Sequence, residues 1–179
     1  MTLESAVVVL IPEADNLLEN FRKHRDPSAA VGVPVHVTIL YPFKAPAELT
    51  AETVSTLREL FASVPAFRVC FAETKCFLDV LYLAPVPDEP FRHLTEIVTD
   101  RFPDTPPYGG EFADVIPHLT VAQVDDPQQL EQIAAEFHLV ARSKLPLRAE
   151  VQSVALMDNS SGQWQICAQF ALRSDTEAS

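Results

Sequence analysis

Apolar residues recur along this chain with two different periods. Segments with apolar runs, or with alternation every second residue, predict strands, because successive side chains of a strand point to opposite faces. These segments are 2–11, 35–40, 66–77, 80–85, 117–124, 147–156 and 163–172. Segments with apolar residues three or four positions apart predict amphipathic helices, because such residues share one helix face. These segments are 12–25, 50–63, 88–102 and 126–137.

Short turns between some of these segments indicate the fold class. Leu78-Asp79 separates two predicted strands, and 158–162 (DNSSG) contains turn-forming residues between the last two. Strands joined in this way are antiparallel neighbours. The proline-containing segments 26–34 and 103–110 are expected to be loops. The pattern therefore predicts an α+β fold with mostly antiparallel sheets.

One strand pattern occurs twice. The segment 35–39 is VHVTI and the segment 117–121 is PHLTV, with their histidines 82 positions apart. In each strand the histidine and the threonine two positions later share one face, while the apolar residues share the other. One face thus suits a core, and the other requires water or a ligand. Packing of the two copies about an approximate two-fold axis would bring two imidazoles and two hydroxyls into one cleft.

The four side chains of this predicted cleft are His36, Thr38, His118 and Thr120. Histidine changes charge near neutral pH, so one imidazole can act as general base while the other acts as general acid. Threonine hydroxyls can donate hydrogen bonds to the non-bridging oxygens of a phosphate. The set therefore indicates cleavage or formation of a phosphodiester by in-line attack, without a metal.

The sequence resembles the 2H phosphoesterase superfamily, which includes bacterial proteins named 2′-5′ RNA ligases and the cyclic nucleotide phosphodiesterases. The family's signature is a pair of H-x-[ST]-x motifs at this spacing, and the chain has HVTI at His36 and HLTV at His118. The segments 41–43 (YPF) and 108–112 (YGGEF) are also similar to those of family members. The order of the predicted elements matches over nearly the whole chain.

The resemblance implies a bilobal fold in which two antiparallel sheets face a water-filled cleft, with helices outside and a pseudo-two-fold repeat. Residues 1–173 are expected to form this single catalytic domain, and 174–179 a frayed tail. The implied reaction is hydrolysis of a 2′,3′-cyclic phosphate or a similar small cyclic phosphodiester, or 2′-5′ joining of RNA ends. The two histidines are then the catalytic pair, the two threonines bind the phosphate, and no metal or other cofactor is expected.

Aromatic and basic residues near the motifs are further candidates. Tyr41 and Phe43 could stack on a nucleobase, and core packing is the alternative for both. Tyr108 could form a lid or pocket wall, or lie in a surface turn. The basic residues at 22–25 could form a rim for a phosphate, but a solvated helix end is the preferred interpretation. Exposed positions are expected for the other histidines, His24, His93 and His138.

Charge and composition narrow the classes of partner. The chain has 13 Lys and Arg against 25 Asp and Glu, and this net charge of −12 opposes binding to duplex DNA and to anionic membranes. Its 4 glycines form neither a dinucleotide-binding fingerprint nor a P-loop. The apolar run 6–11 is too short for a membrane span or a signal sequence. Several family members carry a basic residue shortly after the second motif, where this chain has Ala122, Gln123 and Val124.

These observations favour a small substrate. We expect a monomer that takes a small nucleotide or cyclic phosphate, with RNA ends as the alternative, and that binds neither duplex DNA nor a membrane. Cys70, Cys76 and Cys167 lack metal-binding spacing, so we interpret them as reduced and mostly buried thiols of a cytoplasmic protein.

Two other functions would use the same residues. A binding module would hold a nucleotide or a phosphorylated metabolite without turnover, although binding alone needs no acid–base pair. A metal hydrolase would combine the histidines with Asp114 or Glu111, although the sequence contains no closely spaced, carboxylate-rich ligand set.

Overall fold

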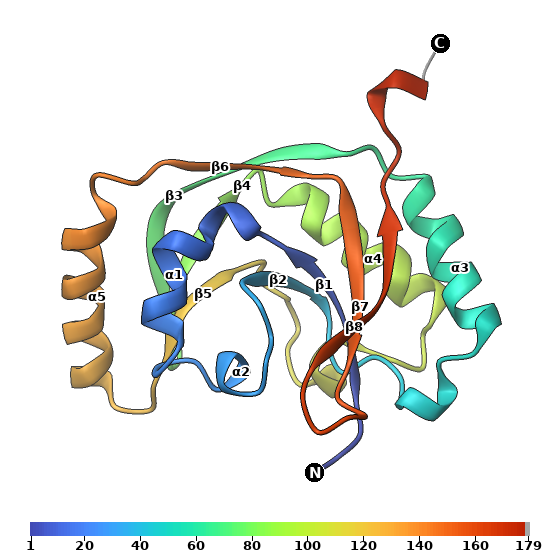
Figure 1. The fold of residues 1–179 in the computed structure, drawn as a ribbon, viewed down its shortest axis with the longest axis horizontal. Coiled ribbons are helices and arrows are strands. Elements are labelled where there is room, and N and C mark those ends of the chain that lie inside the picture. The colour runs from blue at the N-terminus through green and yellow to red at the C-terminus, as the bar shows by residue number, and fades with distance from the viewer. Residues whose placement is uncertain (178–179) are drawn as a thin grey trace.

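Eight strands form one curled antiparallel sheet with helices around it (Figure 1). The computed structural model describes residues 1–177. The strands follow the order β6-β3-β4-β5-β2-β1-β7-β8 across the sheet. They are β1 (Ser5–Leu10), β2 (His36–Leu40), β3 (Phe67–Phe77), β4 (Val80–Val86), β5 (Leu119–Gln123), β6 (Leu147–Val151), β7 (Ser153–Asp158) and β8 (Gln165–Ala171). The predicted α+β class and the antiparallel arrangement are confirmed.

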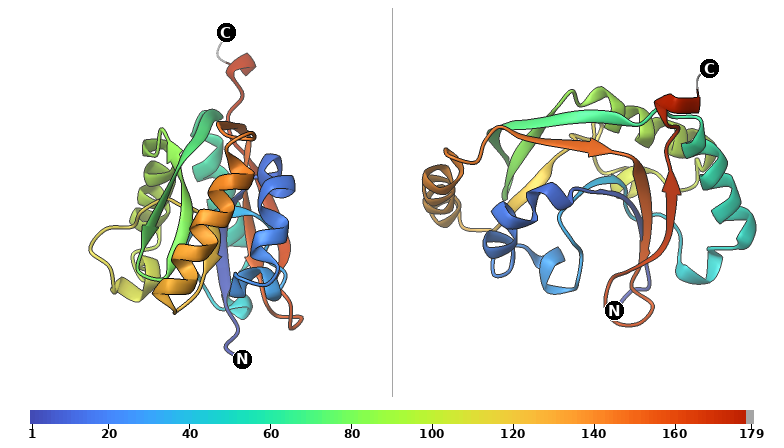
Figure 2. Two further views of the ribbon diagram at one scale, coloured as in Figure 1. Left: turned by 90° about the vertical axis from the view of Figure 1, so that its left-hand side faces the viewer. Right: turned by 45° about the horizontal axis from the view of Figure 1, so that its top comes forward.

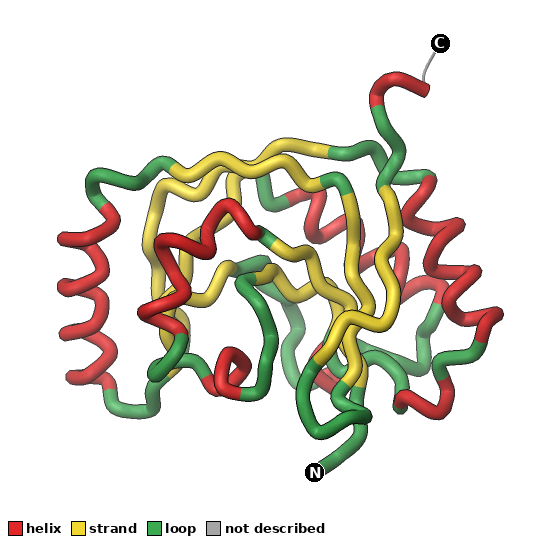
Figure 3. Tube along the Cα trace, viewed as in Figure 1, coloured by secondary structure: helices red, strands yellow, loops and turns green. Residues whose placement is uncertain are grey.

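Helices flank the sheet at its two ends, and others lie against its middle (Figure 3). The α-helices are α1 (Asp15–Arg22), α2 (Pro27–Ala30), α3 (Ala51–Ala62), α4 (Glu89–Arg101) and α5 (Pro127–Ala141). The 3₁₀ turns are η1 (Pro12–Ala14), η2 (Pro46–Glu48), η3 (Pro107–Gly110) and η4 (Asp175–Glu177). Each of the four helices predicted from apolar spacing is present.

The sheet has two halves that meet at its centre. Strands β6-β3-β4-β5 form one half and β2-β1-β7-β8 form the other, and they join where Val37 of β2 pairs with Leu119 of β5. The two sheets expected from the sequence are these two halves of one sheet. The order of strands is symmetrical about the junction, because β1–α1–β2 in one half corresponds to β4–α4–β5 in the other. Helix α1 packs on β5 and α4 packs on β2, so each helix crosses the junction.

Helices α1 and α5 lie side by side at one end of the sheet (Figures 1 and 2). The ring of Phe21 packs edge-on against Phe137 with centroids 5.1 Å apart. Arg25 Nη2 lies 3.3 Å from Glu136 Oε2. These contacts hold α1, which precedes β2 in the sequence, against the half of the sheet that contains β5.

Strand β1 is apolar on both faces. It lies between two clusters of buried residues, one on each face. Val7 and Val9 belong to the main core between sheet and helices. Their neighbours Ala6 and Val8 point to the opposite face and form a smaller cluster with residues of β7. Partly buried side chains, Trp164 among them, pack on this second cluster. The inner face of this half of the sheet is therefore apolar.

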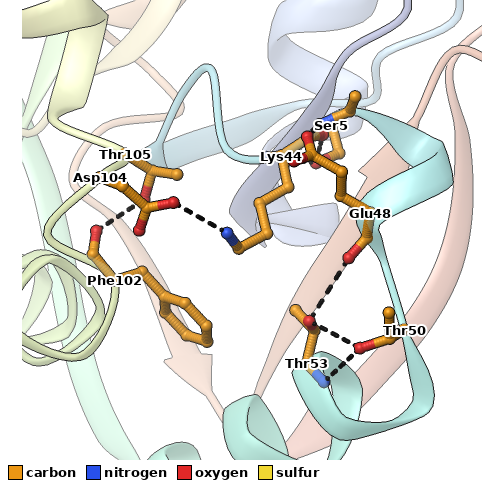
Figure 4. Close-up of polar contacts among 9 residues, drawn as sticks. Ser5, Lys44, Glu48, Thr50, Thr53, Phe102, Asp104 and Thr105 are labelled. Atoms are coloured by element: carbon orange, nitrogen blue, oxygen red, sulfur yellow. Dashed lines mark hydrogen bonds and ion pairs between the residues drawn. The ribbon is translucent and has the colours of Figure 1, made fainter.

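The segment that follows β2 is fixed by contacts with β1 and with the end of α4 (Figure 4). Ser5 Oγ donates a hydrogen bond to the carbonyl oxygen of Lys44 at 2.6 Å, and Lys44 Nζ donates to Asp104 Oδ2 at 3.1 Å. Phe43 is 6% exposed, and its ring packs edge-on against Phe102 with centroids 5.1 Å apart. The chain leaving the first motif is thereby anchored in the core.

The single strand predicted at 147–156 is wrong, because this segment forms two strands. Strand β6 pairs with β3, whereas β7 pairs with β1 in the other half of the sheet. The chain changes halves at Gln152, where no glycine or proline marks the switch. Both parts have strand-like residues, so local periodicity contains no sign of a change of partner.

The predicted loops at 26–34 and 103–110 contain short helical turns. Helix α2 begins after Asp26, whose Oδ1 accepts a hydrogen bond from the backbone N–H of Ser28 at 2.9 Å. The turn η3 occupies 107–110. Single turns of this length are too short for a helical period to be recognised in the sequence.

Cysteine burial differs from the prediction. Cys76 and Cys167 are exposed and Cys70 is half-buried, and none of the three forms a disulfide. The interpretation of these thiols as mostly buried is therefore wrong. Cys70 and Cys76 lie in β3 and Cys167 lies in β8, so all three are strand residues whose side chains are not enclosed by the core.

The C-terminal end is described in part. Residues 175–177 form the turn η4, and residues 178 and 179 of the predicted frayed tail lie outside the described residues. Between residues 1 and 177, no helix combines the length and the apolar character needed to cross a bilayer. The grouping of 1–173 into a single catalytic domain stays a prediction.

Candidate active site

The two repeated motifs lie where the halves of the sheet meet. His36 is the first residue of β2, and His118 directly precedes β5. Both histidines line one cavity of about 640 Å³, together with Thr38 and Thr120. The structure therefore places around one space four side chains that come from distant parts of the sequence.

Strand register relates the two motifs across the junction. Val37 pairs with Leu119 in an antiparallel ladder. In this register His36 lies opposite Thr120, and His118 lies opposite Thr38. Directly opposite residues have Cβ atoms about 5 Å apart, and diagonal ones about 7–8 Å apart. The two imidazoles occupy a diagonal of this arrangement.

Each imidazole is oriented by the same hydrogen bond. Nδ1 lies 2.7 Å from the carbonyl oxygen two residues earlier in both motifs, that of Pro34 for His36 and that of Ile116 for His118. A carbonyl oxygen only accepts, so Nδ1 carries the proton of the neutral ring. Nε2 is then the nitrogen that can take up a proton, and both rings are suited to proton transfer at that atom.

Both imidazoles have lowered pKa values. Burial is the main cause that lowers the pKa of His36 to about 4; the Arg22 cation contributes, while the backbone hydrogen bond and Asp26 oppose the shift. Burial also lowers the pKa of His118, again against its backbone hydrogen bond and Asp26. Both rings are consequently neutral at pH 7 in the free protein. An anion bound between them would raise the pKa of each ring.

Aromatic rings form one wall of the cavity. Tyr41 packs edge-on against Tyr108 and Trp164, with ring centroids 6.4 and 6.1 Å away. Its hydroxyl donates to Glu4 Oε2 at 2.6 Å, and burial together with this carboxylate raises the pKa of Tyr41 to about 12. The phenol is thus neutral and fixed in place. A planar group of a ligand could stack here.

His118 lies among other aromatic rings. Its imidazole packs edge-on against Phe77, with centroids 5.1 Å apart, and against Tyr82 at 5.8 Å. Phe77 also lines the cavity at the end of the β3–β4 hairpin. These rings restrict the orientation of the second imidazole in addition to its backbone hydrogen bond.

The structure separates the three aromatic residues considered from the sequence. Tyr41 and Tyr108 line the cavity, and the backbone N–H of Tyr108 donates to the carbonyl oxygen of Tyr41 at 2.6 Å. A pocket contact by Phe43 is contradicted, because its ring is buried in the core. Strand β2 ends at Leu40, so the rule that residues two apart share a face no longer applies to Tyr41 and Phe43.

Other residues of the cavity were not predicted. Trp164 lines it from the loop between β7 and β8, and its backbone N–H donates to the carbonyl oxygen of Val31 at 2.9 Å. Phe77 and Gln123 contribute from the β3–β4 hairpin and from the end of β5. The sequence signal for Trp164 was its position beside a turn, as the chain's 1 tryptophan.

The charged groups around the cavity are acidic. Asp26, Asp79 and Asp114 line it, and none of the described lining residues is Lys or Arg. Arg22 lies behind Asp26, is 4% exposed, and pairs with its carboxylate at 2.8 Å. The preferred interpretation of 22–25 as a solvated helix end is therefore wrong for Arg22, because the following loop covers it.

Metal-ligating side chains do not cluster in the described part of the chain, since no three His, Cys, Asp or Glu residues gather in a group that could hold a metal ion. Asp114, a candidate ligand, instead lies with its Oδ1 2.8 Å from Arg92 Nη1. The donor set required by the metal-hydrolase alternative is thus missing from residues 1–177.

Known proteins are similar to this chain, one in sequence and others in fold. A protein of Bacillus pumilus (strain SAFR-032), provisionally named a phosphoesterase, is 32% identical over 122 residues, which cover 65% of this chain and 68% of that protein. The structure of Escherichia coli LigT complexed with 3′-AMP superposes with a TM-score of 0.59 at 17% identity, covering 96% of this chain and 99% of LigT. A protein of Thermus thermophilus gives a TM-score of 0.60 at 17% identity, covering 96% of this chain and 99% of that protein.

The sequence profile of the 2′-5′ RNA ligase superfamily matches residues 11–163, which include both motifs and most of the sheet. The chain therefore belongs to the 2′-5′ RNA ligase superfamily, the group of 2H phosphoesterases that its paired motifs resemble.

Proposed function

We propose that this protein is a metal-independent phosphodiesterase that hydrolyses a 2′,3′-cyclic phosphate or a similar small cyclic phosphodiester. One observation carries the proposal. Two imidazoles in one cavity are oriented by the same hydrogen bond at Nδ1, which leaves Nε2 of each to exchange a proton. A site that only bound its ligand would have no need of this pairing.

In the proposed reaction the two histidines exchange one proton each with the substrate. One imidazole, neutral at Nε2, takes a proton from the water that attacks phosphorus. The other, protonated at Nε2, gives its proton to the ribose oxygen that leaves as its bond to phosphorus breaks. Since His36 and His118 are both neutral in the free protein, the second ring acquires its proton as the anionic phosphate binds.

The threonines hold the phosphate in this proposal. Thr38 and Thr120 line the cavity on the same face of the junction as the histidines. Their hydroxyls would donate to the non-bridging oxygens, which gain negative charge in the transition state. Donors fixed on strands need little rearrangement as that charge develops.

The surroundings of the site favour a small ligand with a flat group. The cavity of about 640 Å³ is within the size range of small-molecule sites. Its wall of Tyr41, Tyr108 and Trp164 offers surfaces on which a nucleobase could stack. LigT, which shares the fold, has been crystallised with 3′-AMP, NADP⁺ and ATP, so ligands of nucleotide size fit a cleft of this architecture.

Joining of 2′-5′ RNA ends is the second candidate, because the same acid–base pair would catalyse the reverse reaction. The family's name favours it. The acidic residues that line the cavity and the net charge of −12 disfavour a long RNA substrate. A binding module without turnover is the third candidate, and activity measurements separate it from the first two.

The test is a panel of 2′,3′-cyclic mononucleotides, ADP-ribose cyclic phosphate and short 2′-5′-linked oligonucleotides, assayed with and without EDTA. We expect hydrolysis of cyclic mononucleotides that EDTA does not change and that His118→Ala lowers about 10²–10⁴-fold. His93→Ala is the matched control, since His93 is an exposed histidine of α4. Binding of the panel without turnover would identify a binding module, and loss of activity in EDTA with recovery on adding a divalent metal would contradict the metal-free mechanism.

A further inference from the structure

Two arginines make the same main-chain contact in the two motifs. Arg22 of α1 donates from Nη2 to the carbonyl oxygen of Val33 at 3.0 Å. Arg92 of α4 donates from Nη1 to the carbonyl oxygen of Val115 at 3.1 Å. Each valine lies three residues before a motif histidine. The contact is therefore repeated with the symmetry of β1–α1–β2 and β4–α4–β5.

The carbonyl that each arginine holds is next to the one that orients the imidazole. In the first motif Val33 accepts from the arginine and Pro34 accepts from Nδ1 of His36. In the second motif Val115 accepts from Arg92, and the next residue, Ile116, accepts from Nδ1 of His118. The two carbonyls belong to adjacent planar peptide units that share one Cα, so a contact at the first restrains the position of the second. The arginine contact thus fixes the backbone from which the ring is held.

We propose that Arg22 and Arg92 are equivalent positioning residues, each of which fixes the segment that orients one imidazole. Neither is among the described residues that line the cavity, and each contacts its motif through a backbone carbonyl. The inference rests on the proposed function, because the direction of Nε2 affects a rate only if the imidazoles transfer protons.

Carboxylates hold each guanidinium in place. Nε of Arg22 donates to Asp26 Oδ2 at 2.8 Å, and Nε of Arg92 donates to Asp88 Oδ2 at 2.8 Å. Arg92 Nη1 also donates to Asp114 Oδ1 at 2.8 Å. The planar fork of arginine can reach a carboxylate and a carbonyl at once, which the single ammonium of lysine cannot do in the same geometry.

The two contacts differ in burial, which decides where to test them. The side chain of Arg22 is 4% exposed and that of Arg92 is 38% exposed. Removal of Arg22 would leave the Asp26 carboxylate buried without its counter-charge, so a loss of folding would accompany any change in position. Arg92 is therefore the primary residue to substitute, and the milder Arg22→Lys serves as its counterpart.

The experiment compares Arg92→Met, Arg92→Lys and Asp114→Asn in the full chain. Nitrogen-15 NMR of the imidazoles reports which ring nitrogen carries the proton. In Arg92→Met we expect His118 to populate both neutral tautomers while His36 keeps its Nδ1–H form, and Arg22→Lys should reverse this selectivity. Asp114→Asn removes one carboxylate that holds Arg92 but leaves Asp88 and the carbonyl oxygen of Val115 as its partners, so it should disturb the ring of His118 less than Arg92→Met does. Arg68→Met, at an exposed position of β3, is the matched control.

Kinetics give the second measurement, with a 2′,3′-cyclic mononucleotide as substrate. Arg92→Met should lower kcat about tenfold or more with little change in KM, because misplacement of a proton-transfer group affects the transition state more than binding. Arg92→Lys should recover part of this loss. A lowered melting temperature with unchanged tautomers and unchanged kcat would overturn the positioning role. If the arginine variants change the tautomers but the wild-type protein hydrolyses none of the panel, the proposed function is rejected while the positioning of the rings by arginine stands.

Discussion

Val37 and Leu119 pair with each other at the centre of the sheet, and each directly follows a motif histidine. Both side chains are completely buried in the main core. Because side chains alternate along a strand, burial of this pair directs both histidines to the opposite face. A slip of one residue would move them into the core. One apolar contact thus determines where two imidazoles lie.

Loss of either imidazole should remove most of the activity. We expect His36→Ala or His118→Ala to lower kcat about 10²–10⁴-fold, the contribution typical of a positioned acid or base. The double variant should be little worse than either single one, because the pair acts as a unit. Steady-state kinetics on a cyclic mononucleotide would measure this. Strictly additive losses would indicate that the rings act independently, against the proposed mechanism.

The threonines should matter less than the histidines. Thr38→Val and Thr120→Val keep the shape of the side chain and remove the hydroxyl that would donate to the phosphate. We expect kcat to fall by about one to three decades, in the range of a lost oxyanion donor. Thr74→Val, at an exposed position of β3, is the control. Unchanged rates in both motif variants would mean that the phosphate is held elsewhere.

Trp164 should report ligand binding through its fluorescence. It lines the cavity and is the chain's 1 tryptophan, so its emission comes from the site alone. A cyclic mononucleotide that stacks on this wall should change the emission in a saturable way. Trp164→Ala should raise KM more than it lowers kcat, since stacking stabilises substrate and transition state alike. Emission that stays constant at saturating substrate would place the ligand away from this wall.

Stability should fall as the solution becomes acidic. The pKa of His36 is about 4 in the folded protein against an ordinary value of 6.5, so between these values the unfolded chain binds more protons. The free energy of unfolding therefore rises with pH across this window, and part of it is lost as pH falls from 6.5 toward 4. His118, whose pKa is also lowered, adds to the same trend.

Urea unfolding at about pH 7.5 and about pH 5 measures this effect. His36→Gln cannot be protonated, so its stability should decrease less between the two conditions than that of the wild type. His93→Gln should behave as the wild type does, because His93 is exposed. An equal decrease in His36→Gln would show that this imidazole contributes nothing to the pH dependence.

Sequence reasoning worked where local periodicity and the structure depend on the same alternation. His36 and Thr38 share a face because β2 is a strand with a buried opposite face, and this much is visible in five residues. The change of partner at Gln152 is set by pairing with β3 on one side and β1 on the other. Such long-range pairing leaves no mark on the local pattern.

The burial of Arg22 and the residues that line the cavity could also not be predicted from the sequence. Arg22 is basic and ends a helix, which is typical of a solvated position. It is buried because Asp26, Ser28 and the carbonyl oxygen of Val33 supply its hydrogen bonds, and these come from a loop whose path the sequence did not indicate. Trp164 reaches the site for the same kind of reason, through a loop whose backbone bonds to Val31.

Substrate size is the most discriminating remaining property. Asp26, Asp79 and Asp114 line the cavity, so a chain of further phosphates leaving the site would meet carboxylates rather than cations. An extended RNA would release few counterions on binding, and the net charge of −12 would repel it. A cyclic mononucleotide has one phosphate for the threonines and one flat base for the aromatic wall.

We therefore expect kcat/KM to be higher for a 2′,3′-cyclic mononucleotide than for an oligonucleotide with the same terminus, with little dependence on salt for the mononucleotide. A preference for the oligonucleotide that weakens steeply as salt is raised would reveal a basic track outside the cavity, and charge substitutions at Arg142, Lys144 and Arg148 would then locate it.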